Sequence, residues 1–308
     1  MTKVLTVATR GGRLAIAQTQ TVSSLLKKVH PGLQINIKTI TTRGDRDRRT
    51  ALWNLKDTGF FTSKLEDALL AGQADLAVHS YKDLPTRHRD GLTIAAVCDR
   101  RFAEDCFLAS GSVNSIDRLP PAAKIGTSSL RRAAQLKHLR PDLAPAAIRG
   151  NVLTRIRRLE EGKFDAIILA RAGLERLGLA DKISFCFDPA RFIPAPAQGA
   201  LAVQTRADDV TANELIASID DVELRTVTSA ERKILTAMQC GCHAPVGAFA
   251  KIAGGNIGIT AFISDLEGRN FIRRQITGLA QNAETLAENL AADLLASGGK
   301  KILASLEE

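Results

Sequence analysis

Apolar residues with two different spacings organise the first part of the chain. Residues 4–8 form a short apolar run that predicts a strand, and this run ends in Thr9-Arg10-Gly11-Gly12. Apolar residues then recur at mostly helical spacing over 14–29, and Pro31-Gly32 ends that helix. The pattern continues with a strand over 33–40, a helix over 62–71 and a strand over 74–78. Alternating strands and helices predict an α/β fold.

A second stretch of the chain repeats this alternation. Ile125 leads into Gly126-Thr127-Ser128-Ser129, and we expect a helix from there to residue 139, a strand over 146–148 and a helix over 152–161. Residues 165–169 are too apolar for a strand with one face in water, which is typical of parallel sheets. The Pro-rich run 193–200 predicts a segment that crosses between domains.

The pattern changes from about residue 222. A helix over 224–238 leads to the run Gly241-Cys242-His243, and three strands are expected over 247–252, 256–263 and 270–276. A final helix is expected over 283–296. Consecutive strands followed by a helix predict a small α+β domain.

Composition indicates a soluble protein with free thiols. The 308 residues suffice for two or three domains, 45% of them are hydrophobic, and no apolar run approaches the roughly 20 residues of a membrane helix. The N-terminus lacks the apolar stretch of a signal peptide, so we expect a cytoplasmic protein without a membrane partner. In that reducing compartment, five cysteines indicate free thiols rather than a disulfide framework.

Positive charge is concentrated in one segment of the chain. Ten Lys and Arg residues but one acid, Asp142, lie between Arg118 and Arg158, whereas the whole chain carries a net charge of +9. Such a segment predicts an anionic partner, either nucleic acid or a small molecule rich in carboxylates. Aromatic residues make up only 4% of the chain, which argues against base stacking on single-stranded nucleic acid.

Polar residues directly follow several predicted strands, where ligands bind in open α/β sheets. The residues in these places are Arg10, Lys82, Asp83, Thr127 and Arg149. Arginine suits such a site because its planar guanidinium grips a carboxylate with two hydrogen bonds. For Asp83 the sequence leaves two interpretations open, a surface ion pair or a carboxylate that stabilises a cation and moves a proton.

The run from Thr127 to Ser129 meets the start of a helix, so it fits either an anion site or ordinary N-caps. Arg131-Arg132 just downstream favours the anion site, because adjacent arginines project differently and at least one can reach a ligand. Asn151 is a candidate N-cap for the next helix, and Arg155 lies on its side of that helix. We assign Arg157 and Arg158 to a solvated face.

Cys242 stands in a glycine-flanked loop, Cys240-Gly241-Cys242-His243. Metal binding is disfavoured because no second cluster of Cys and His completes four ligands. An inert buried thiol and a reachable thiol suited to covalent attachment remain as the two interpretations. His79, within an apolar run, fits a structural role better than that of a ligand.

Taken together, these motifs resemble the porphobilinogen deaminase family over nearly the whole chain. The segments that carry the resemblance are Val7-Ala8-Thr9-Arg10, Thr42-Arg43-Gly44-Asp45, 77–85, 126–132, Arg149-Gly150-Asn151, 165–170, Gln198-Gly199-Ala200 and Gly241-Cys242. The resemblance implies two α/β lobes of the periplasmic-binding-protein kind with a central cleft, plus a small C-terminal α+β domain. The expected domains are 1–98 with 194–217, 99–193, and 218–308.

The resemblance also implies a transferase that works as a monomer in tetrapyrrole biosynthesis. Four porphobilinogen molecules are joined with loss of ammonia to give hydroxymethylbilane, on a dipyrromethane cofactor bound to Cys242 through a thioether. Asp83 and Lys82 match the catalytic positions. Cofactor binding falls to Cys242, Lys82, Asp83, Thr127, Ser128, Ser129, Arg131 and Arg132. Substrate binding falls to Arg10, Arg149, Arg155, Arg176 and Gln198.

Several positions depart from the pattern of the family. Gly12-Arg13 stands where Ser-Pro is usual, Thr58 stands where a lysine is expected, and Tyr81 and Ala197 replace the more usual Met and Gly. Two other functions remain as alternatives, a non-catalytic two-lobed protein that binds an organic anion and a nucleic-acid-binding protein. The first needs neither Cys242 nor Asp83, and the second predicts affinity that falls steeply with salt.

Overall fold

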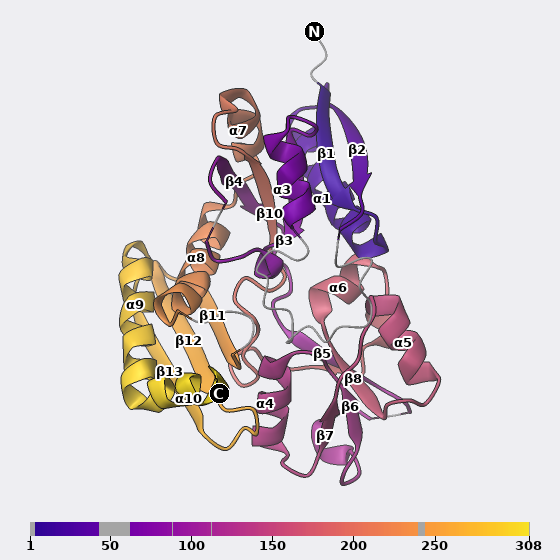
Figure 1. Cartoon of the computed structure of the whole chain (residues 1–308), viewed down its shortest axis with the longest axis vertical. Coiled ribbons are helices and arrows are strands. Elements are labelled where there is room, and N and C mark those ends of the chain that lie inside the picture. Colours follow the sequence, from indigo (N-terminus) through magenta and orange to yellow (C-terminus); the bar gives the residue numbers. More distant parts are fainter. Residues whose placement is uncertain (1–3, 43–61, 88, 112, 240–243, 308) are drawn as a thin grey trace. The chain divides into compact units, whose positions relative to one another are not determined.

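The computed structural model describes residues 4–42, 62–87, 89–111, 113–239 and 244–307 (Figure 1). The described residues divide into two compact units. Unit 1 takes 4–42, 62–101 and 199–225, and unit 2 takes 102–198 and 226–307. None of the helices in this described part is long and apolar enough to cross a membrane. The division into three domains stays a prediction.

Unit 1 is built on a five-stranded mixed sheet with the order β2-β1-β3-β10-β4. Strand β1 pairs in parallel with β2 and β3, whereas β10 is antiparallel to both β3 and β4. The strands span Val4–Arg10 (β1), Gln34–Ile40 (β2), Leu76–Ser80 (β3), Leu92–Cys98 (β4) and Leu201–Arg206 (β10). The helices span Arg13–Val29 (α1), Ser63–Leu70 (α3) and Val210–Ala217 (α7).

Alternating side chains bury both faces of this sheet. Val22 and Leu26 of α1 pack with Leu76 and Val78 of β3 in one core cluster. Ala77, between those two strand residues, joins Leu65 and Leu69 of α3 in another cluster. Because successive strand residues point to opposite faces, α1 and α3 cover opposite sides of the sheet.

Unit 2 contains a second five-stranded sheet with the order β7-β6-β8-β5-β9. Strand β6 is parallel to β7 and β8, and β5 is antiparallel to β8. The strands span Asp105–Ala109 (β5), Lys124–Gly126 (β6), Ala144–Ala146 (β7), Ala166–Ala170 (β8) and Phe185–Cys186 (β9). Helices α4 (Leu130–Leu139) and α5 (Val152–Glu160) pack in separate core clusters, and α6 (Arg171–Arg176) follows β8 directly.

Helix α8 (Val222–Ala237) leads to a third, antiparallel sheet with the order β11-β12-β13. Its strands span Val246–Ala253, Asn256–Ser264 and Phe271–Leu279, and α9 (Ala283–Leu294) and α10 (Lys300–Glu307) follow. The hairpin between β12 and β13 packs on α4. There the ring of His138 stacks on Phe271 at 4.0 Å between centroids, and a Cβ at Gly268 would lie 2.4 Å from the Ala134 carbonyl oxygen. This glycine therefore allows the third sheet to pack within unit 2.

The structure confirms the predicted α/β fold class with a small C-terminal α+β part, and every predicted helix is present. Two predicted strands are displaced. The strand expected over 74–78 is Leu76–Ser80, and the one expected over 146–148 is Ala144–Ala146. The latter pairs with β6 as far as Ala146, and the backbone of Ile148 instead bonds the side chain of Ser128.

Other elements were absent from the sequence analysis. Strands β4, β5, β9 and β10, helices α6 and α7, and the last helix α10 were not predicted. The final helix was expected to end at residue 296, but the chain turns at Gly298, whose φ is +121°, and continues as α10. Glycine adopts this φ without the steric penalty that a Cβ would bring.

Candidate active site

The carboxyl edge of the unit 1 sheet presents a cation and a carboxylate side by side in sequence. Arg10 is the last residue of β1, and Lys82 and Asp83 lie in a three-residue 3₁₀ turn immediately after β3. Since β1 and β3 are adjacent and parallel, their carboxyl ends lie at the same edge. The structure therefore brings Arg10, Lys82 and Asp83 to one edge, as the sequence predicted.

Two buried side chains fix the turn that carries Lys82 and Asp83. Tyr81 is 5% exposed and donates its N–H to the Ala200 carbonyl at 3.0 Å, and Leu84 is 4% exposed. Between these anchors Lys82 is half-buried and Asp83 is exposed. Asp83 forms no ion pair with any residue that the structure describes. The surface ion pair that the sequence left open for Asp83 is therefore absent from the described chain.

His79, the penultimate residue of β3, is buried, with 6% of its surface exposed. Burial lowers its pKa to about 4 and the charge of Arg10 adds to the effect, although a contact with Gln204 opposes it. The Nε2 of His79 has no hydrogen-bond partner among the described residues. A neutral, buried imidazole agrees with the structural role that the sequence favoured.

The corresponding edge of the unit 2 sheet is built around the start of α4. Thr127, Ser128 and Ser129 follow β6, and each hydroxyl is engaged locally. Thr127 Oγ1 accepts from Ser129 N at 3.2 Å, Ser128 Oγ donates to Ile148 O at 2.5 Å, and Ser129 Oγ accepts from Arg132 N at 3.4 Å. Ser129 is therefore the N-cap of α4. The anion site expected here rests on the helix N-terminus and the arginines rather than on unengaged hydroxyls.

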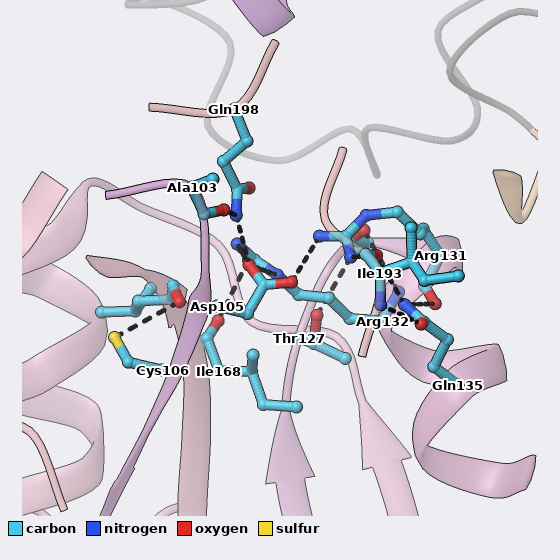
Figure 2. Close-up of polar contacts among 12 residues, drawn as sticks. Ala103, Asp105, Cys106, Thr127, Arg131, Arg132, Gln135, Ile168, Ile193 and Gln198 are labelled. Carbon is cyan, nitrogen blue, oxygen red and sulfur yellow. Dashed lines mark hydrogen bonds and ion pairs between the residues drawn. The ribbon is translucent and has the colours of Figure 1, made fainter. Parts of the chain in front are cut away.

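Arg131 and Arg132 both meet one carboxylate, Asp105, which the sequence analysis missed (Figure 2). Asp105 Oδ1 accepts from Arg132 Nε at 3.0 Å and from Arg132 Nη2 at 2.7 Å. Oδ2 lies 2.7 Å from Arg131 Nη2 as an ion pair, without hydrogen-bond geometry. Asp105 begins β5 opposite Ala170 at the end of β8, which places it at the same edge as Thr127. An acid that opens an otherwise apolar run, Asp105-Cys106-Phe107-Leu108, was the available signal.

Burial and charge act in opposite directions on this group. Asp105 is 0% exposed, and burial alone would raise its pKa. The charges of Arg131 and Arg132, with hydrogen bonds from Arg132 and Gln198, outweigh burial and hold the pKa well below the usual 3.8. Burial in turn lowers the pKa of Arg131. Two guanidinium groups on one carboxylate leave a net positive charge at this edge.

Gln198 joins the same cluster, as Figure 2 shows. Its Nε2 donates to Asp105 Oδ1 at 2.9 Å and to the Ala103 carbonyl at 2.8 Å. Gln198 was expected to bind substrate, and the structure places its amide on the arginine–aspartate cluster. Its contact with substrate remains a prediction.

The remaining predicted cations of unit 2 are all half-buried. Arg149 lies three residues beyond β7, Arg176 ends α6, and Arg155 turns back along α5 to donate from Nε to the Gly150 carbonyl at 2.8 Å. Asn151 caps α5 through Thr154 N at 2.9 Å, as predicted. Arg157 is exposed and pairs with Glu161 at 3.5 Å, which agrees with a solvated face.

Two groups of predicted residues lie outside the described chain. Cys242 belongs to 240–243, and Thr58 and Arg43-Gly44-Asp45 belong to 43–61. Cys106 and Cys186 are free thiols, and burial raises the pKa of both. In the part of the chain that the structure covers, no group of three His, Cys, Asp or Glu is placed to hold a metal ion.

Known proteins match this chain along its length. The family model for the dipyrromethane cofactor-binding domain of porphobilinogen deaminase matches residues 5–214, and the model for the C-terminal domain of that enzyme matches 225–296. Porphobilinogen deaminase of Desulforudis audaxviator is 43% identical over 304 residues, which cover 99% of this chain and 98% of the relative.

Solved structures of binding proteins align with about seven-tenths of the chain at low identity. The methionine-binding protein MetQ aligns with 70% of this chain and 89% of its own, at a TM-score of 0.45 and 13% identity. A probable amino-acid transporter binding protein of Bacillus subtilis aligns with 71% of this chain and 90% of its own, at a TM-score of 0.44 and 13% identity. The full-length relative and the two family models show that this chain belongs to the porphobilinogen deaminase family.

Proposed function

We propose that this chain joins four porphobilinogen molecules, with loss of one ammonia from each, into the linear tetrapyrrole hydroxymethylbilane. The observation that carries the proposal is the turn Tyr81–Asp83, which presents an exposed carboxylate beside a cation at the sheet edge of a chain of this family. We assign the domains as 1–98 with 194–217, 99–193, and 218–308, and expect a cytoplasmic monomer that needs neither nucleic acid nor a membrane.

The residues present fit a dipyrromethane group. Each pyrrole ring carries an acetate and a propionate, so the group requires cations and N–H donors. Unit 2 offers both. The two positive charges of Arg131 and Arg132 outnumber the single negative charge of Asp105, and the N-terminus of α4 supplies backbone N–H groups beside them. We assign its attachment to Cys242. When bound, the group supplies a covalently held pyrrole end to which substrate units are added.

Asp83 is the residue that we assign to the chemistry. Loss of ammonia from porphobilinogen leaves an electrophilic, positively charged pyrrole. An exposed carboxylate stabilises that charge and takes up the proton that the attacked ring gives up when the new carbon–carbon bond forms. Lys82 beside it, together with Arg10 on the neighbouring strand, binds substrate carboxylates.

Substrate binding by the other cations follows from the chemistry of a growing chain. Every unit added brings two more carboxylates, and half-buried guanidinium groups hold carboxylates more strongly than fully hydrated ones. We assign Arg149, Arg155 and Arg176 to this role, with Thr127, Ser128 and Ser129 presenting the start of α4. The concentrated positive charge of unit 2 then serves a small polyanion rather than nucleic acid.

Turnover of porphobilinogen by Asp83→Ala tests this assignment. The unmodified protein should release one ammonia per porphobilinogen and form one tetrapyrrole per four. Asp83→Ala should lose about 10³-fold in kcat, the typical contribution of a positioned acid or base. Asp90→Ala, a second exposed carboxylate on the connection after β3, is the matched control and should keep full turnover.

Two outcomes would contradict the proposal. Full turnover by Asp83→Ala would remove Asp83 from the chemistry. Tight binding of porphobilinogen without ammonia release by the unmodified protein would instead support the anion-binding alternative.

A further inference from the structure

The segment from Ile193 to Gln198 is bonded directly to the arginine cluster of unit 2. The Ile193 carbonyl accepts from Arg131 Nη1 at 2.6 Å and from Gln135 Nε2 at 3.0 Å, and Ile193 N donates to Gln135 Oε1 at 2.6 Å. At its other end, Gln198 donates to Asp105 at 2.9 Å. The position of this segment therefore helps to set the position of Arg131 and of Asp105 (Figure 2).

The opposite side of the segment is bonded to the edge of the third sheet. Strand β11 is an edge strand, and Ala248 N donates to the Pro194 carbonyl at 3.2 Å. Ala250 N donates to Glu231 Oε1 at 2.8 Å, and Glu231 Oε2 accepts from Ala197 N at 2.7 Å. Glu231, on α8, is 0% exposed. One buried carboxylate thus links the sheet edge to the segment, and both of its oxygens are used.

Ala197 adopts a backbone conformation that alanine disfavours. Its φ is +60°, and Gln198 N donates to the Ala195 carbonyl at 2.9 Å, which closes a turn with Pro196 and Ala197 at its centre. A turn with proline second and a positive φ third is of the kind that normally has glycine in the third place. The family pattern noted above has glycine here. The charged hydrogen bond from Ala197 N to Glu231 therefore holds a turn that the side chain of Ala197 strains.

We propose that Glu231 is a positioning residue for the arginine pair. By holding Ala197 in the left-handed region, it fixes where Gln198 meets Asp105 and where Ile193 meets Arg131. This inference rests on the proposed function, in which Arg131 and Arg132 bind carboxylates. It links the strand that begins four residues after Cys242 to the residues assigned to hold the pyrrole chain.

Glu231→Gln tests the proposal, with two glycine variants as a matched pair. In cofactor-loaded protein, Glu231→Gln should raise the KM for porphobilinogen about tenfold with little change in kcat, the result of losing one charged hydrogen bond that orients binding groups. Adding Ala197→Gly should lower that KM again, because glycine adopts the turn without strain. Adding Ala122→Gly, at an exposed alanine that also has a φ of +60°, should leave the raised KM unchanged.

Amide hydrogen exchange of the same variants, without cofactor, separates this inference from the proposed function. Exchange over residues 193–198 should speed up in Glu231→Gln and slow again with Ala197→Gly, whether or not the protein turns over porphobilinogen. An unchanged KM in Glu231→Gln would overturn the positioning role, and so would equal rescue by Ala122→Gly. If Glu231→Gln does not fold, Glu231→Asp, whose shorter side chain cannot span both amides, takes its place under the same criteria.

Discussion

The two sheet edges that carry the candidate site residues share one construction but differ in burial. In each unit, parallel strands end together, and polar or charged residues lie at or near their carboxyl ends. In unit 1, a three-residue turn leaves Asp83 exposed, without an ion pair to a described residue. In unit 2, Arg131 and Arg132 are 5% and 6% exposed and are fixed on a fully buried Asp105.

In the proposed function, this difference in burial lets the same arrangement of strands serve two different roles. A carboxylate that handles protons must reach the substrate, and a short turn between buried anchors provides that access. Cations that hold carboxylates gain from fixed geometry, and the buried Asp105 supplies it. The two carboxylates should therefore respond in opposite ways, Asp83 through turnover and Asp105 through stability.

The largest expected effect on stability is that of Asp105→Asn. The substitution leaves two buried guanidinium groups without their counter-charge, and breaking a buried ion pair in this way costs about 3–5 kcal/mol. Urea unfolding followed by circular dichroism measures the loss. Asp142→Asn, which removes the pair between the exposed Asp142 and the half-buried Arg140, is the control and should cost far less unfolding free energy.

Lowering the pH should reveal the contribution of Asp105 to the stability of the unmodified protein. Because its pKa is depressed in the folded state, Asp105 stabilises the fold above the unfolded pKa of about 4, and that stability is lost as the pH falls below it. Asp105→Asn should flatten the decline of the urea midpoint below pH 4. A decline as steep as that of the unmodified protein would show that Asp105 is not the group responsible.

A somewhat smaller effect on stability is expected from His79 of unit 1, over a higher range of pH. The pKa of His79 is about 4 in the folded protein, below the 6.5 of an unperturbed histidine, so the unfolded chain binds this proton more readily. Stability should therefore be full above pH 6.5 and fall by about 3 kcal/mol as the pH drops to 4. His79→Gln should flatten the urea midpoint over this interval.

If the urea midpoint of His79→Gln fell with pH as steeply as that of the unmodified protein, His79 would not be the group that titrates in unit 1, and this contrast between the units would be wrong.

The sequence predicted the helices and strands with clear periodicity, and the polar residues near their ends. It did not predict which buried side chains form ion pairs. The helix that starts after Ser129 and the polar residues at or near the ends of β1, β3 and β6 followed from local spacing and capping. Asp105 did not, because its arginine partners are 26 and 27 residues away in sequence and β5 has only five residues, the first of them an acid. Long-range ion pairs leave no periodic signal.

Local bonding also displaced one prediction. Ala146–Ile148 has the composition of a strand, but Ser128 takes both backbone groups of Ile148 and ends the pairing at Ala146. At Ala197 the sequence showed that an alanine stands where glycine is usual, but the consequence became clear only from its positive φ in the structure. In both places a tertiary contact decided the backbone, and such contacts cannot be read from spacing.

In the proposed function a pyrrole chain grows from Cys242, so the intact mass of the denatured protein is the most direct measurement. After incubation with porphobilinogen, the mass should exceed that of the polypeptide by two deaminated porphobilinogen units. Cys240→Ser, two residues away, should keep this excess, and Cys242→Ser should lack it. An unmodified mass after incubation, or the same excess on Cys242→Ser, would contradict the assignment of the cofactor to Cys242.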